Sequence, residues 1–96
     1  MKLHELKIKH EYLIDVTLGT KTFELRKNDR DYQVGDLIHF IDIREDNITP
    51  NKCLVEPFID ENTLYRITYV LKDVEKYGLD KDYCILAIKK LEIKEM

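Results

Sequence analysis

The chain has 96 residues, of which 44% are hydrophobic and 36% charged, and its formal net charge is −3 at pH 7. This length and composition predict one globular domain over residues 1–96 and exclude an intrinsically disordered chain. No run approaches the roughly 20 apolar residues that cross a bilayer, and the N-terminus lacks the apolar core of a signal peptide, so we expect a cytoplasmic protein without a membrane partner.

The charges are distributed unevenly along the chain. Residues 1–30 carry seven Lys or Arg against five Asp or Glu, whereas residues 31–96 carry nine against fourteen. An acidic protein with a net positive N-terminal third can present a local basic patch. The overall balance argues against a protein dedicated to coating a nucleic-acid duplex, which would be more basic.

The first two elements follow from hydrophobic periodicity. Residues 3–9 alternate polar and apolar side chains and predict a strand. His4 lies on the apolar side of this strand, which favours a core or rim histidine with a hydrogen-bond partner, although a role as a donor at the rim of a cleft stays open. Residues 11–18 have the spacing of a short helix. Gly19 fits the position after its last turn, where glycine adopts positive φ at little cost.

Residues 22–26 alternate again and predict a second strand, which a charged turn follows. Neighbouring side chains of a strand face opposite sides, so Phe23 and Leu25 are expected to enter the core. Glu24 and Arg26 are then expected to lie together on the other face. Such a pair is either a weak surface ion pair or the floor of a polar binding cleft, and the alternation leaves both interpretations open.

The remaining elements complete a small barrel. We expect a central strand at 37–43, loops at 44–51 and 56–62 with a short edge strand at 53–55 between them, a strand at 64–71, one helical turn at 73–76 and a last strand at 83–93. Five or six strands with one or two short helices define an α+β fold, a small mixed β-barrel.

Four residues at the end of the helix and in the next strand carry a family resemblance: Gly19, Lys21, Glu24 and Arg26. The chain resembles the ASCH group of PUA-like domains, small barrels regarded as RNA-binding, in which a helix ends in Gly-x-Lys and the following strand carries Glu-x-Arg. The segments at 4–8, 26–30 and 34–36 are similar to a small, uncharacterised branch of this group that is often encoded in bacteriophage and in gut and lactic bacteria. Weaker similarity at 66–71 and 78–86 extends the resemblance over most of the chain except residues 45–62.

The resemblance implies an RNA-binding domain that holds RNA or a modified base in a polar cleft. The candidate binding residues are Lys21, Thr22, Glu24, Arg26, Asn28, Asp29 and Arg30. A glutamate can accept a hydrogen bond from an exocyclic amine, and arginine and lysine supply donors for bases and phosphate. Among the aromatic residues, the sequence assigns Tyr12, Phe23, Tyr65 and Tyr69 to the core and Tyr32 to the surface.

Two other functional classes stay open. Some ASCH-like domains are similar to a small amidohydrolase that deacetylates a modified cytidine with Lys, Thr and Glu residues, of which the Lys and Thr lie in a Lys-Thr-x-Thr stretch after the helix. Here Lys21 and Thr22 match, but Glu24 replaces the second threonine, so no catalytic residue is assigned. A phage-type module that binds a protein partner through the acidic residues 42–61 is the third class.

The sequence predicts neither a metal site nor a cofactor. Cys53 and Cys84 are isolated thiols, and we assign Cys84 to the core. The histidines at 4, 10 and 39 are scattered over different predicted elements, which makes a metal triad improbable.

Overall fold

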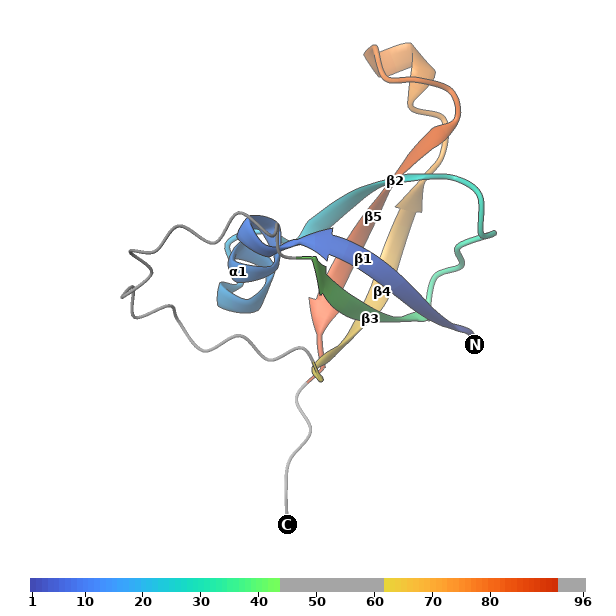
Figure 1. The fold of residues 1–96 in the computed structure, drawn as a ribbon. Helices are drawn as coiled ribbons and strands as arrows, with labels where there is room; N and C mark the ends of the chain where they lie inside the picture. Colours follow the sequence, from blue (N-terminus) through green and yellow to red (C-terminus); the bar gives the residue numbers. More distant parts are fainter. Residues whose placement is uncertain (44–61, 92–96) are drawn as a thin grey trace.

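The structure is a computed structural model that describes residues 1–43 and 62–91. In these residues five strands form one mixed sheet that curls into a half-barrel, with one α-helix at one end (Figure 1). The elements are β1 (Leu3–Lys9), α1 (His10–Leu18), β2 (Phe23–Lys27), β3 (Leu37–Ile43), β4 (Leu64–Leu71), the short 3-10 helix η1 (Glu75–Tyr77) and β5 (Tyr83–Lys90). The α+β class and the barrel-like architecture are confirmed. The expected edge strand at 53–55 and the loop around it lie outside the described residues.

The strands follow the order β1-β3-β4-β5-β2 across the sheet. The β1 strand pairs in parallel with β3, whereas the pairs β3–β4, β4–β5 and β5–β2 are antiparallel. The β3 strand is therefore an interior strand, as predicted. Although β1 and β2 are neighbours along the chain, they form the two edges of the sheet, and α1 connects them (Figure 1).

The α1 helix ends at Leu18, as predicted, and begins at His10, one residue earlier than predicted. It ends at Gly19, which has φ 81° and whose N–H donates to the carbonyl oxygen of Val16 at 3.1 Å. Leu13 and Val16 are its buried residues, and the helix packs against β1 and β3. The left-handed Gly19 ends the helix at the point where the chain must turn toward β2. No helix in residues 1–43 and 62–91 is long and apolar enough to cross a membrane.

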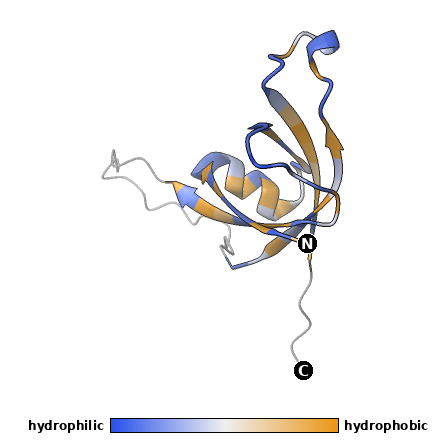
Figure 2. Cartoon of the chain, turned by 90° about the vertical axis from the view of Figure 1, so that its right-hand side faces the viewer, coloured by the Kyte–Doolittle hydropathy of each residue, from blue (hydrophilic) through white to orange (hydrophobic). Residues whose placement is uncertain are grey.

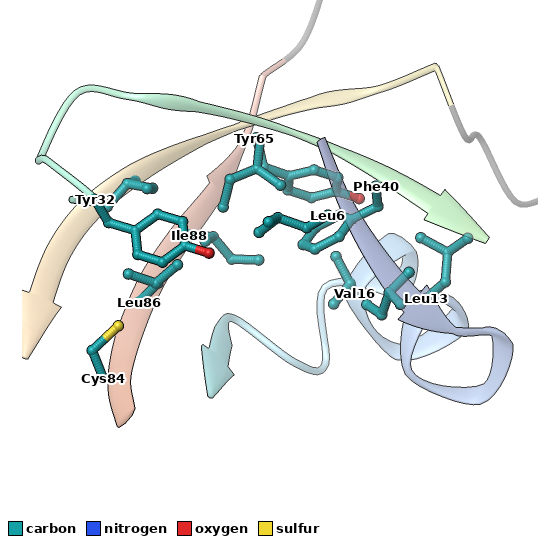
Figure 3. Close-up of a cluster of buried hydrophobic side chains, with 12 residues drawn as sticks. Leu6, Leu13, Val16, Tyr32, Phe40, Tyr65, Cys84, Leu86 and Ile88 are labelled. Atoms are coloured by element: carbon teal, nitrogen blue, oxygen red, sulfur yellow. The ribbon is translucent and has the colours of Figure 1, made fainter. Parts of the chain in front are cut away.

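The core fills the inner face of the half-barrel (Figure 3). Every described strand except β2 contributes apolar side chains to it, and α1 closes it: Leu6, Ile8, Leu13, Val16, Ile38, Phe40, Tyr65, Ile67, Cys84, Leu86 and Ile88. Each large aliphatic or aromatic side chain buried in this way contributes roughly 1.5–3 kcal/mol to the hydrophobic term of folding. Figure 2 shows hydrophobic stretches along the strands and along α1, whereas the η1 helix itself is hydrophilic. The assignment of Cys84 to the core is confirmed.

The orientation predicted for β2 is wrong. Glu24 is only 4% exposed, whereas Phe23 and Leu25 are 50% and 46% exposed. The cause is the pairing with β5, because Glu24 lies opposite Leu86, a fully buried residue. Residues directly opposite each other in an antiparallel pair share a face of the sheet, so β5 determines which side of β2 faces inward. Phe23 lies opposite Ala87 on the outer face.

A bulge in β4 changes the face of its second half. The pairing with β5 shifts register between Ile67 and Tyr69, so the alternation that buries Tyr65 and Ile67 does not continue. Tyr69 is 60% exposed, and Val70 packs against the core in its place. Tyr65 is a core residue as predicted, whereas the core assignment of Tyr69 is wrong.

The loop between β2 and β3 carries a buried tyrosine. The sequence placed Tyr32 at the surface, but its side chain is 1% exposed and its ring lies 4.8 Å from the ring of His4. The loop folds inward because it is hydrogen-bonded to β4: Gly35 N–H donates to the carbonyl oxygen of Ile67 at 2.8 Å, and Ile67 N–H donates to that of Asp36 at 2.8 Å. These bonds hold the loop against β4, and Tyr32 joins the core cluster.

Candidate ligand-binding cleft

A cleft of about 550 Å³ lies between the two edges of the sheet, where β1 and β2 face each other. It is lined by residues of β1 (Lys7 to Lys9) and β2 (Phe23 to Arg26), together with Tyr12, Lys21 and Ile43. Its volume is in the range of small-molecule sites, which measure about 300–1,000 Å³. The candidate residues Lys21, Glu24 and Arg26 all line this cleft, so the structure brings these three charged side chains together.

Glu24 is the buried centre of the cleft. Its Oε1 forms an ion pair with Lys21 Nζ, and its Oε2 lies 3.6 Å from Arg26 Nη1. Lys21 Nζ also donates to the carbonyl oxygen of Phe23 at 2.7 Å. A carboxylate removed from water needs such partners, because the cost of burying an unpaired charge is several kcal/mol.

Two exposed aromatic rings flank the lysine. Lys21 Nζ lies 5.5 Å from the ring centroid of Tyr12 and 4.9 Å from that of Phe23, within the range of cation–π contacts. Both rings are about half exposed, so the core assignments of Tyr12 and Phe23 are wrong. The cleft therefore combines apolar ring faces with a charged floor.

Arginine side chains join the two edges beside the cleft. Arg26 Nη1 donates to the carbonyl oxygen of Lys7 at 2.9 Å, and Arg30 Nη1 donates to that of Glu5 at 3.0 Å. Alternate carbonyl groups of β1 point toward β2, and the guanidinium groups occupy the place that a neighbouring strand would take. Arginine side chains thus bridge the β1 and β2 edges of the sheet, which no backbone hydrogen bonds connect in the described residues.

The Arg26 guanidinium also lies near the hydroxyl of Tyr32, and both side chains line a second, smaller cleft. Burial raises the pKa of this phenol above its ordinary value, and the neighbouring Arg26 opposes the effect by stabilising the phenolate. Tyr32 is therefore a neutral phenol beside Arg26. The sequence missed this arrangement because nothing in the alternation of the loop indicates that Tyr32 is buried.

A second buried polar cluster holds the start of β1. Asp36 accepts hydrogen bonds from His4 Nε2 at 2.8 Å, from the N–H of Lys2 at 3.1 Å and from the N–H of Gln33 at 3.1 Å. Burial by itself raises the pKa of Asp36, but these hydrogen bonds outweigh it and hold the pKa below the ordinary value. The interpretation of His4 as a core histidine with a partner is confirmed.

Four predicted site residues lie outside the cleft. Thr22 is exposed and lines a separate pocket of about 160 Å³, and its carbonyl oxygen accepts the N–H of Ile88 at 3.0 Å. Asn28 is exposed and uses its N–H to bond the carbonyl oxygen of Asp82 at 2.7 Å. Asp29 lines a second, smaller cleft next to the first, as does Arg30.

That second cleft contains residues that the sequence interpretation missed. Lys27 and Tyr83, which lie opposite each other in the β2–β5 pair, both line it. Lys27 could have been predicted from the sequence, because it belongs to the basic run at 26–30. Tyr83 carried no such signal, because a tyrosine at the start of a predicted strand is ordinary. Among the described residues, no group of three or more His, Cys, Asp or Glu is arranged to hold a metal ion.

Comparison with known proteins identifies the family of the chain. Residues 3–88 match the family described as a domain of unknown function, DUF3850, and the chain belongs to that family. The crystal structure of hypothetical protein PH0355 is similar, with a TM-score of 0.54 and 16% sequence identity over 95% of this chain and 100% of that protein. At this identity the likeness shows a shared fold. No curated protein matches the chain.

Proposed function

We propose that the chain is a PUA-like domain of the ASCH type that binds RNA by holding a base, or a modified base, in the cleft between β1 and β2. The PUA-like assignment is supported by the half-barrel and by the position of the family pattern, with Gly19 ending α1 and Glu24 and Arg26 on the next strand. The observation that carries the proposal is the buried Glu24 between two cations, beside exposed aromatic rings.

This combination suits an unpaired base. Tyr12 and Phe23 offer ring faces on which a base can stack, and stacking of this kind contributes about 1–3 kcal/mol per base. Glu24 can accept a hydrogen bond from the exocyclic amine of cytosine or adenine, and the free N–H groups of Arg26 can donate to ring or carbonyl acceptors. Single-stranded RNA presents such edges once its bases are unstacked.

The amidohydrolase is the second candidate, and the contact between Lys21 and Glu24 inside the cleft is the observation that favours it. The threonine hydroxyl that this covalent mechanism needs is not supplied there. Thr22 lies outside, and the described residues that line the cleft include no Ser, Thr or Cys. A hydrolytic route would have to use a water activated by Glu24. Binding therefore accounts for more of the cleft than hydrolysis does.

The test is a titration of labelled single-stranded RNA of mixed sequence at low salt. Tyr12→Ala removes one stacking face and should weaken binding by about 5- to 150-fold, the equivalent of 1–3 kcal/mol. Tyr77→Ala is the matched control, because Tyr77 is an exposed tyrosine in η1, away from the cleft (Figure 1). Absence of binding by the wild type, or equal weakening by both variants, would contradict the proposal.

Glu24→Gln tests the recognition of the base itself. The substitution keeps an acceptor oxygen and adds a donor, so it should change which base is preferred more than it changes total affinity. The measurement is competition by the four nucleosides against labelled RNA. An unchanged order of competition in Glu24→Gln would show that Glu24 does not read the base.

A further inference from the structure

A second cleft adjoins the candidate base-binding cleft at the C-terminal end of β2. It has a volume of about 270 Å³ and shares Leu25 and Arg26 with the first cleft. Arg26, Lys27 and Arg30 line it together with one carboxylate, that of Asp29. Three cations against one anion is a local excess of positive charge on a chain whose formal net charge is −3. Such a cleft attracts an anion.

The cations of this cleft keep donors available for a ligand. Arg26 and Arg30 each donate through Nη1 to a carbonyl oxygen of β1, at 2.9 and 3.0 Å. A guanidinium has five N–H groups in a rigid fork, so these bonds hold each side chain in place and leave further donors. Within residues 1–43 and 62–91, no hydrogen bond or ion pair engages the Lys27 ammonium, and Lys27 is exposed.

Two arginine forks held by β1 and an exposed lysine match the oxygens of a phosphate. Forked donors bind phosphate through paired hydrogen bonds, which are stronger than bonds between neutral groups. The position of the cleft gives a reason for such a group to be there. Because the two clefts share Leu25 and Arg26, a base in the first and a phosphate in the second would be neighbours.

We propose that the second cleft binds the phosphate of a nucleotide whose base occupies the first cleft. The ligand is then a phosphorylated nucleoside, free or within an RNA strand, rather than a free nucleoside or base. This inference rests on the proposed base-binding function and adds the chemical class of the ligand to it.

The experiment compares cytidine and adenosine with their 5′- and 3′-monophosphates and with the dinucleoside monophosphates CpC and ApA, by titration calorimetry. We expect the phosphorylated forms to bind at least about tenfold more tightly, since hydrogen bonds to a charged group contribute about 1.5–3 kcal/mol. The advantage should shrink as salt increases. Preference for a monophosphate identifies a free nucleotide as the source of the phosphate, whereas preference for the dinucleoside identifies RNA.

Lys27→Ala should reduce the affinity ratio between nucleotide and nucleoside. Lys90→Ala is the matched control. Lys90 is an exposed lysine at one end of β5, whereas Tyr83, which pairs with Lys27, lies at the other end. The Lys90→Ala substitution should leave the affinity ratio unchanged. Equal affinities for nucleoside and nucleotide in the wild type would overturn the phosphate site and leave the base cleft in place.

If neither nucleosides nor nucleotides bind, the proposed function fails. The second cleft is then tested for anion binding by titration with inorganic phosphate alone. Saturable amide shifts at residues 27–30 in NMR spectra, lost in Lys27→Ala, would still support an anion site. Unchanged spectra at high phosphate concentration would overturn it.

Discussion

The Nη1 atom of Arg26 donates to the carbonyl oxygen of Lys7 at 2.9 Å, and this bond joins two strands that no backbone ladder connects in the described sheet. The same guanidinium lies beside Glu24 in the cleft and near the hydroxyl of Tyr32. Arg26 therefore belongs both to the closure of the half-barrel and to the candidate site. Stability and binding should change together when Arg26 is replaced.

Arg26→Ala should destabilise the protein by about 1–3 kcal/mol, because a carbonyl oxygen of β1 loses its donor and the buried Glu24 loses one of two cations. The measurement is urea unfolding of the variant and the wild type. Arg66→Ala is the control, since Arg66 is an exposed arginine on β4 with no bond to β1 among the described contacts. A midpoint equal to that of wild type would show that the bond to Lys7 has no role in stability.

The orientation of β2 can be tested with two leucines that lie on opposite faces of the sheet. Leu86 is fully buried, and Leu25 is 46% exposed. Leu86→Ala should cost about 2–5 kcal/mol, through lost burial and the cavity left behind. Leu25→Ala should cost about 1 kcal/mol or less, and even Leu25→Asp should leave the protein folded, contrary to the orientation expected from the alternation. Unfolding of Leu25→Asp would contradict the register of β2 and β5.

Most strand positions could be predicted because each has one clearly apolar side. Residues 3–9 place Leu6 and Ile8 on the same side, and the structure buries both. The β2 strand has no such side, since a strand that alternates Phe, Glu, Leu and Arg can bury either its apolar pair or its charged pair. The choice came from Leu86, more than sixty residues away in sequence. Local alternation contains no information about that partner.

Only part of the candidate site could be predicted, because a local sequence pattern does not show which side chains tertiary packing buries or leaves exposed. Lys21, Glu24 and Arg26 were predicted from the resemblance to the ASCH pattern, and all three line the cleft. The aromatic walls were not found, because an apolar residue at a regular position is ordinarily buried and only tertiary packing shows that Tyr12 remains exposed. Tyr32 was missed because long-range bonds between its loop and β4 bury it.

Asp36 should make the stability of the protein depend on pH in the acid range. The pKa of Asp36 is lower in the folded state than its ordinary value of 3.8, so its stabilising effect is fully present above about 3.8. The effect is lost as the pH falls through the folded pKa, because protonation removes the acceptor of the His4 bond. The stability difference between wild type and Asp36→Asn should therefore be largest near neutral pH and shrink below pH of about 4.

Thermal unfolding at a series of pH values measures that difference. Asp73→Asn is the control, because Asp73 forms only an exposed pair with Lys76, and exposed pairs contribute about 0–1 kcal/mol. A difference between wild type and Asp36→Asn that stays constant down to pH of about 3 would contradict the low pKa of Asp36.

Hydrolysis of acetylated cytidine separates an enzyme from a binding domain. We expect the protein to bind the nucleoside without releasing acetate, because Thr22 lies outside the cleft and both oxygens of Glu24 are already close to cations. The measurement is chromatography of cytidine after long incubation at high protein concentration. Acetate release that is lost in Glu24→Gln and retained in Thr22→Ala would show a water-based hydrolase at Glu24. Release lost in Thr22→Ala would instead require Thr22 to turn into the cleft when substrate binds, and either result would replace the binding proposal with catalysis.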